Sequence, residues 1–141
     1  MSGGSAIYTA TFAYNAASQL TSGTDNSSAY VFSYNSNGLV TKIDNNGTAT
    51  GPRVVLDLTY DNLSRLLSQA ATVSSTADFL DNYTYNAAGQ LTKLTQQGQT
   101  GGNSVAAKRL DFSYSTTGQL TSVDRYANLT GTQLVACPWA S

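Results

Sequence analysis

Five copies of one short motif run through the chain, and this repetition limits the possible folds more than any other feature. Each copy has a tyrosine two positions after an aromatic residue or leucine, then a short polar turn, then a leucine or valine. The central tyrosines lie 20 to 29 residues apart: Tyr14, Tyr34, Tyr60, Tyr85 and Tyr114. We therefore divide the chain into a flexible leader over residues 1–6, five repeats over 7–125, and a degenerate repeat or closing strand over 126–141.

The residues before each tyrosine predict a β-strand. Apolar side chains alternate with polar ones, and they include the aromatic residues Phe12, Phe32 and Phe112. A period of two places these side chains on one face of a strand. Stacked repeats should bring the equivalent tyrosines and phenylalanines into rows of buried rings, which we prefer to a sugar-stacking platform.

The residues after each tyrosine predict a tight turn. Asn, Asp or Ser stands at its first position, and Gly38, Gly89 and Gly118 stand at its fourth. This is the pattern of a type I turn followed by a residue with positive φ, which rejoins the returning strand through a bulge. Ser18 and Ser64 hold the glycine position in copies one and three, so those turns should be more strained or built differently.

A second strand begins just after each turn, at Leu20, Val40, Leu66, Leu91 and Leu120. In three copies the next apolar residue comes three places later, as Ile43, Leu94 or Val123, which does not fit a period of two. Either the strand bulges there, or these residues serve the opposite face.

The composition narrows the function. Charged residues make up 11% of the chain and the net charge is −1, so no basic stripe is available for nucleic acid. The chain has no His and one Cys, which removes the usual base of a Ser or Cys nucleophile and the usual zinc ligands. No apolar run approaches the ~20 residues that span a bilayer. We expect no catalytic, cofactor-binding or metal-binding residues and no membrane insertion.

The motif of aromatic-x-Tyr-Asp/Asn-x-x-Gly-x-Leu-Thr resembles the YD repeat of the RHS family. This family includes bacterial toxins, the shells of insecticidal toxin complexes and animal teneurins. Only Tyr60-Asp61 keeps the literal dipeptide, but Asn and Ser can take the same turn position. The resemblance implies an all-β fold, in which tandem antiparallel hairpins form one curved sheet. It also implies an extracellular or cell-surface location in a bacterium.

The number of strands leaves two shapes open, a small closed barrel and an open sheet. An open sheet would expose two unlike edges, so we expect a non-enzymatic scaffold that forms a homo-oligomer or filament through them. Candidate assembly contacts are Tyr8, Leu134 and Cys137, although a buried thiol is the simpler interpretation of Cys137. The alternatives are a carbohydrate-binding or adhesive module and a fragment of a toxin-encapsulating shell.

Overall fold

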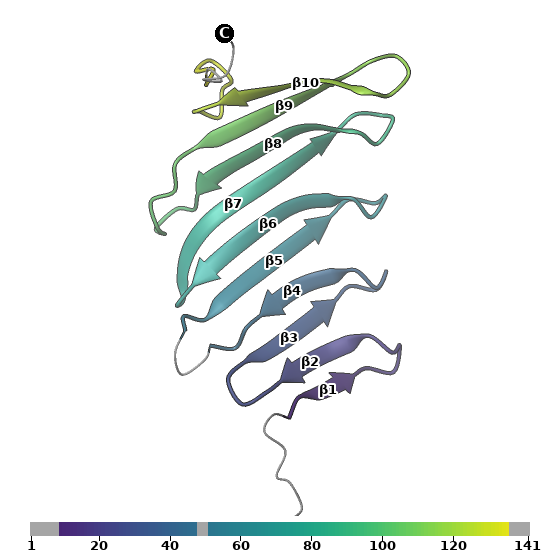
Figure 1. The fold of residues 1–141 in the computed structure, drawn as a ribbon, viewed down its shortest axis with the longest axis vertical. Coiled ribbons are helices and arrows are strands. Elements are labelled where there is room, and N and C mark those ends of the chain that lie inside the picture. Colours follow the sequence, from purple (N-terminus) through teal and green to yellow (C-terminus); the bar gives the residue numbers. More distant parts are fainter. Residues whose placement is uncertain (1–8, 48–50, 136–141) are drawn as a thin grey trace, which may run out of the picture.

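The computed structural model describes residues 9–47 and 51–135, which form one antiparallel sheet. Ten strands lie side by side in the order of the chain (Figure 1). Their bounds are β1 Thr11–Tyr14, β2 Leu20–Thr24, β3 Ala29–Tyr34, β4 Val40–Asp44, β5 Val54–Tyr60, β6 Leu66–Val73, β7 Thr76–Tyr85, β8 Leu91–Gly98, β9 Lys108–Tyr114 and β10 Leu120–Tyr126. The predicted all-β class and tandem hairpins are confirmed, and each returning strand starts at the predicted residue.

The five repeat turns share one backbone geometry. Gly38, Gly89 and Gly118 have φ values of 80°, 80° and 84°, as the motif predicts. Ser18 and Ser64 adopt the same left-handed conformation, with φ values of 60° and 64°. The two serine turns are therefore built like the glycine turns, and these residues carry the strain that a Cβ introduces at positive φ.

A β-bulge follows every turn and settles the three-residue step in the apolar pattern. In the second hairpin Tyr34 pairs with Val40, whereas Ser33 pairs with Lys42, so Thr41 is the extra residue. The register shifts at the same place in the other four hairpins. Because of this bulge, Val40 and Ile43 lie on the same face of the sheet. Their cross-strand partners on that face are Tyr34 and Phe32.

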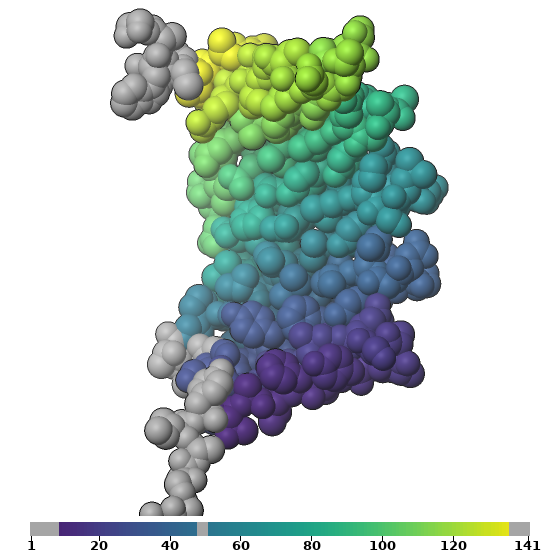
Figure 2. All heavy atoms as spheres, turned by 45° about the vertical axis from the view of Figure 1, so that its right-hand side comes forward, coloured from purple at the N-terminus to yellow at the C-terminus, as the bar shows by residue number. Residues whose placement is uncertain are grey.

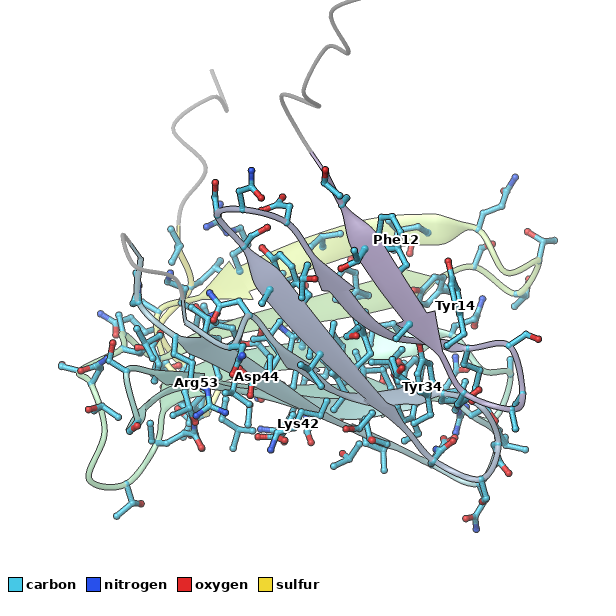
Figure 3. The ribbon with its side chains drawn as sticks, turned by 90° about the horizontal axis from the view of Figure 1, so that it is seen from below. Phe12, Tyr14, Tyr34, Lys42, Asp44 and Arg53 are labelled. Atoms are coloured by element: carbon cyan, nitrogen blue, oxygen red, sulfur yellow. The ribbon has the colours of Figure 1, made fainter. Side chains whose placement is uncertain are left out.

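The sheet has one apolar face and one polar face. The apolar face carries the repeat tyrosines and phenylalanines, which pair across the strands with other apolar side chains, except that Phe12 lies opposite Gly23. Lys42 is out of phase with Ile43 and points to the opposite side from Phe12 and Tyr14 in Figure 3. Among the described residues, Ala71 is the one apolar side chain that is fully buried. The molecule is thus a single layer whose apolar face is only partly covered by its own side chains.

The sheet is open, which rules out the closed-barrel alternative. Its strands contact only their neighbours in the sequence, and β1 and β10 lie at opposite ends of the molecule (Figures 1 and 2). Closure would require the last strand to tilt and curl back onto the first. Here each strand is already paired along the chain, and β10 never reaches β1.

The segment after β10 folds back along that strand without becoming an eleventh strand. Tyr126 and Leu134 form an isolated antiparallel bridge, and the N–H of Val135 donates to the carbonyl of Arg125 at 2.7 Å. Leu134, a predicted assembly contact, remains exposed. Tyr8 and Cys137 lie outside the described residues. Within the described ranges, no helix is long and apolar enough to cross a membrane.

Candidate functional site: two side-chain ladders and the sheet edges

The first residue of each repeat turn uses its side chain to hold the turn closed. The Oδ1 atom of Asn15 accepts from the N–H groups of Ala17 and Gln19 at 2.9 and 3.0 Å. Asn35 and Asp61 accept from the equivalent pairs of N–H groups, and Asn86 and Ser115 each accept from the second of them. This shared contact explains why Asn, Asp and Ser interchange in the motif.

The central tyrosines join each repeat to the one before it. The hydroxyl of Tyr34 donates to the carbonyl oxygen of Leu20 at 2.7 Å, and the hydroxyl of Tyr60 donates to that of Val40 at 2.8 Å. Tyr85 and Tyr114 make the same bond to Leu66 and Leu91. The acceptor is always the first residue of the preceding returning strand. We call these four bonds the tyrosine ladder.

A second set of hydrogen bonds joins the turns, and here the donor side chain belongs to the earlier repeat and the acceptor carbonyl to the later one. The Nε2 atoms of Gln19 and Gln90 donate to the carbonyls of Gly38 and Gly118, at 3.2 and 3.1 Å. Arg65 occupies the equivalent position and reaches the carbonyl of Asn86 at 3.4 Å. We call these three bonds the turn ladder. Three of the four junctions between successive repeats therefore have two side-chain connections besides the main-chain pairing. The junction between the second and third repeats has the Tyr60 bond, because Leu39 stands at the turn-ladder position there.

The turn-ladder side chains are themselves held in place. In the first repeat Asn15 Nδ2 donates to Gln19 Oε1 at 2.7 Å, and Asn86 holds Gln90 in the same way at 2.8 Å. Arg65 pairs with Asp61 and stacks over the ring of Tyr85, with its guanidinium carbon 4.7 Å from the ring centre. The N–H of Arg65 and its guanidinium lower the pKa of Asp61.

Asp44 forms an ion pair with Arg53. Asp44 is buried, and its Oδ1 also accepts from the N–H of Asn46 at 2.8 Å. The side-chain hydrogen bonds from Arg53 lower the pKa of Asp44. Over residues 9–47 and 51–135, no group of three Asp, Glu, His or Cys side chains could hold a metal ion.

A groove of about 610 Å³ lies at the C-terminal end of the sheet. Leu94, Leu110 and Val123 give it apolar walls, and Asp81 lies at its side. The Oδ1 atom of Asp81 is buried without a hydrogen-bond partner among the described residues. Burial raises the pKa of this carboxyl, and Gln96 and Lys108 offset part of the effect.

The N-terminal edge of the sheet lacks the cover that interior repeats receive. Tyr14 is 62% exposed, while the other four ladder tyrosines are half-buried. Its hydroxyl has no partner among the described residues, which include no strand before β1. Phe12 is 61% exposed, whereas Phe32 and Phe112 are half-buried. The prediction of a row of buried aromatic rings is therefore wrong at this edge, because no described repeat packs against the outer side of β1.

The C-terminal edge is incomplete in the complementary way. Leu120 is 55% exposed and Val123 is 44% exposed, whereas their counterparts in the earlier hairpins are half-buried. In the described part of the chain no tyrosine donates to the Leu120 carbonyl, and the side-chain amide of Gln119 has no partner. One edge thus presents a ladder donor, and the other presents the matching acceptor.

The sequence motif located the tyrosines and turn glycines correctly, but it gave no role to Gln19, Arg65 and Gln90. A signal for them exists, because the residue after the positive-φ position is glutamine in three of the five copies. Its function becomes visible only when the spacing of adjacent turns is known.

These observations define a tandem hairpin-repeat domain, in which main-chain pairing and two side-chain ladders join the units. The teneurin YD-shell family matches residues 3–130, and the chain belongs to this family. It is a structural β-shell module, and the resemblance to YD repeats is confirmed. No match is found among curated proteins.

Proposed function

We propose that this protein is a non-enzymatic scaffold that associates with further copies of itself through the edges of its sheet. The observation that carries the proposal is the open sheet with two unlike edges, each short of the contacts that interior repeats make. Outward N–H and C=O groups on such edges are templates for strand pairing.

Neither edge is strongly protected against pairing. The edge strand β1 reads Thr-Phe-Ala-Tyr and has no charge, proline or bulge of its own. On β10, the described part of the returning segment pairs with the end of the strand near Arg125 and leaves the rest of the outer edge uncovered. Natural sheets that remain monomeric commonly cover their edges or place charged side chains on them.

The polar groups of the module support a scaffold and not a catalyst. The turn acids and amides and the four donor tyrosines of the ladder bind one another or the main chain, as do Arg53, Arg65 and Arg109. The family resemblance supports a location at or outside a bacterial cell surface, and we include this location in the proposal.

Sedimentation velocity and negative-stain electron microscopy of the purified chain test the association. We expect the sedimentation coefficient to rise with protein concentration, with rods or rings on the grid. A chain that remains monomeric at millimolar concentration would refute the proposal.

A second candidate function rests on the exposed aromatic rings near β1. Phe12, Tyr30 and Phe32 line a cleft of about 200 Å³ on the apolar face, and such rings can stack on sugars. A glycan array tests whether the chain binds carbohydrate, with Phe12→Ala and Tyr30→Ala as site variants and Leu63→Ala as a surface control. Signal that is unchanged in both ring variants would exclude this cleft.

A further inference from the structure

We infer that copies associate head to tail, so that β10 of one copy pairs with β1 of the next and extends both ladders across the contact. This inference rests on the proposed self-association and specifies its partner, polarity and register. The occupant of each edge is a second copy of this chain.

The main-chain groups that face outward can be assigned from bonds within the hairpins. On the first hairpin, the N–H of Asn15 donates to the Gln19 carbonyl, so the main chain of Asn15 faces β2. Because successive residues of a strand face alternate sides, the N–H and C=O of Ala10 face away from β2. At the other edge, the Arg125 carbonyl accepts from Val135 on the outer side of β10. Two residues earlier, Val123 therefore also faces outward.

The internal junctions fix the register of such a contact. Between repeats, Ser22 pairs with Val31 and Lys42 pairs with Asp57. In each case a residue two places after the start of the returning strand meets a residue three places before the next tyrosine. Applied to the two edges, this rule pairs Ser122 with Thr11, Val123 with Ala10, and Asp124 with Thr9.

This contact has as many residue pairs as the shorter junctions between repeats within one copy. The pairings of β2 with β3 and of β4 with β5 each contain three residue pairs. Among the described residues, the hydrogen bonds of the returning segment to β10 extend to Arg125 and stop short of these three pairs. Two successive copies can therefore meet as closely as two successive repeats of one copy.

The same register aligns the free groups of both ladders. The hydroxyl of Tyr14 would donate to the Leu120 carbonyl of the preceding copy, as Tyr34 does to Leu20. The Gln119 amide would donate to the Ser18 carbonyl of the following copy, as Gln19 does to Gly38. The side chains of Phe12, Leu120 and Val123 would become as buried as the equivalent side chains of the interior repeats.

A symmetric contact lacks this complementarity. Two β1 edges would bring together two tyrosine donors and no ladder carbonyl, and two β10 edges would bring together two acceptors. The head-to-tail contact is heterologous, so it propagates into a ring or a fibre.

Proline substitutions at each edge test the polarity. Ala10→Pro and Val123→Pro each remove one outward N–H, while the pairing inside the hairpins is retained. We expect each variant alone to be monomeric. A mixture of the two should form a heterodimer and nothing larger, because Ala10→Pro keeps its β10 edge and Val123→Pro keeps its β1 edge. Circular dichroism verifies that both variants remain folded.

Ladder variants test the side-chain contacts without altering either strand. Removal of the donor hydroxyl in Tyr14→Phe should weaken association about fivefold, the usual effect of one hydrogen bond. Gln119→Ala should weaken it similarly, and Tyr30→Phe, which changes a tyrosine of the same face outside the ladder, should have no effect. Ser115→Asn should tighten association, since it supplies the amide that holds Gln19 and Gln90 in their repeats.

The outcomes separate this inference from the proposed function. A wild-type chain that never associates refutes both. Association that persists in Ala10→Pro alone, or is unchanged by Tyr14→Phe and Gln119→Ala, leaves a self-associating scaffold but overturns the head-to-tail contact.

Discussion

A residue at the fourth position of each repeat turn adopts positive φ whether or not it is glycine. The sequence predicted this conformation at Gly38, Gly89 and Gly118, because the Asn-x-x-Gly pattern carries it. It left Ser18 and Ser64 open, since a serine offers no such signal. In the structure both serines adopt the same conformation, and their N–H groups donate to the main-chain carbonyl of the first turn residue as the N–H groups of the turn glycines do.

Substitutions at this position should have opposite effects on stability. Gly89→Ala should lower the free energy of unfolding by about 1 kcal/mol or more, since alanine is strained at positive φ. No side-chain clash is needed, because the nearest atom to an added Cβ is 3.9 Å away. Ser18→Gly should raise the free energy of unfolding by up to about 1 kcal/mol. Urea denaturation measures both, and Ala88→Gly in the same turn controls for the flexibility of glycine. Equal effects of Gly89→Ala and Ala88→Gly would contradict this account.

The sequence did not predict the chemistry of Asp81, which lies outside the tyrosine-and-turn motif. The structure places it within β7, with one buried carboxylate oxygen unpaired. Burial raises its pKa in the folded state, so the charged carboxylate destabilises the fold at neutral pH.

Asp81→Asn should therefore raise the melting temperature at pH 7. The raised folded-state pKa means that the native protein binds the proton more tightly than the unfolded chain does. The penalty should fall as the pH decreases through the folded pKa, and it should vanish below the unfolded value of about 3.9. Thermal melts between pH 3 and pH 8 measure this, with the exposed Asp57→Asn as the control. A gain that does not change with pH would contradict the assignment.

At the scale of the strands, the sequence predicted most of the fold. The apolar alternation and the turn motif placed five hairpins and the start of every returning strand. The step from Val40 to Ile43 stayed ambiguous, because the bulge that explains it is a property of strand pairing. The turn between β6 and β7 had no recognisable signal either, since Ser74 and Ser75 take positive φ in place of the usual Asn-Gly.

The tyrosine ladder should contribute to stability only where a preceding repeat supplies the acceptor. In the Ala10→Pro background, which keeps the chain monomeric, Tyr85→Phe should lower the free energy of unfolding by about 1 kcal/mol, because the Leu66 carbonyl loses its donor. Tyr14→Phe in the same background should be neutral. Chemical denaturation compares the two variants, and equal losses would show that the hydroxyls do not act through the ladder.

At the scale of the whole molecule, the sequence could not decide between a barrel and an open sheet. The residues of β1 and β10 resemble those of interior strands, so nothing in their pattern marks them as edges. The outcome depends on the accumulated twist and curvature of ten strands, to which no single residue corresponds. A single layer with one fully buried apolar side chain among the described residues then draws its stability from neighbouring hairpins.

Such a stack should be most stable at its centre and least stable at its ends. β5 to β8 are long and paired on both sides, and the buried Ala71 lies in β6, between β5 and β7. The hairpin of β1 and β2 pairs with the rest through three residue pairs. In monomeric Ala10→Pro, amide hydrogen exchange should therefore be slowest in β5 to β8 and fastest in β1 and β10. In the assembled wild-type chain the edge amides of Ala10 and Val123 should become protected, which removes most of this gradient. Uniform protection in the monomer would instead mean that the sheet opens as one cooperative unit, with its ends held as firmly as its centre.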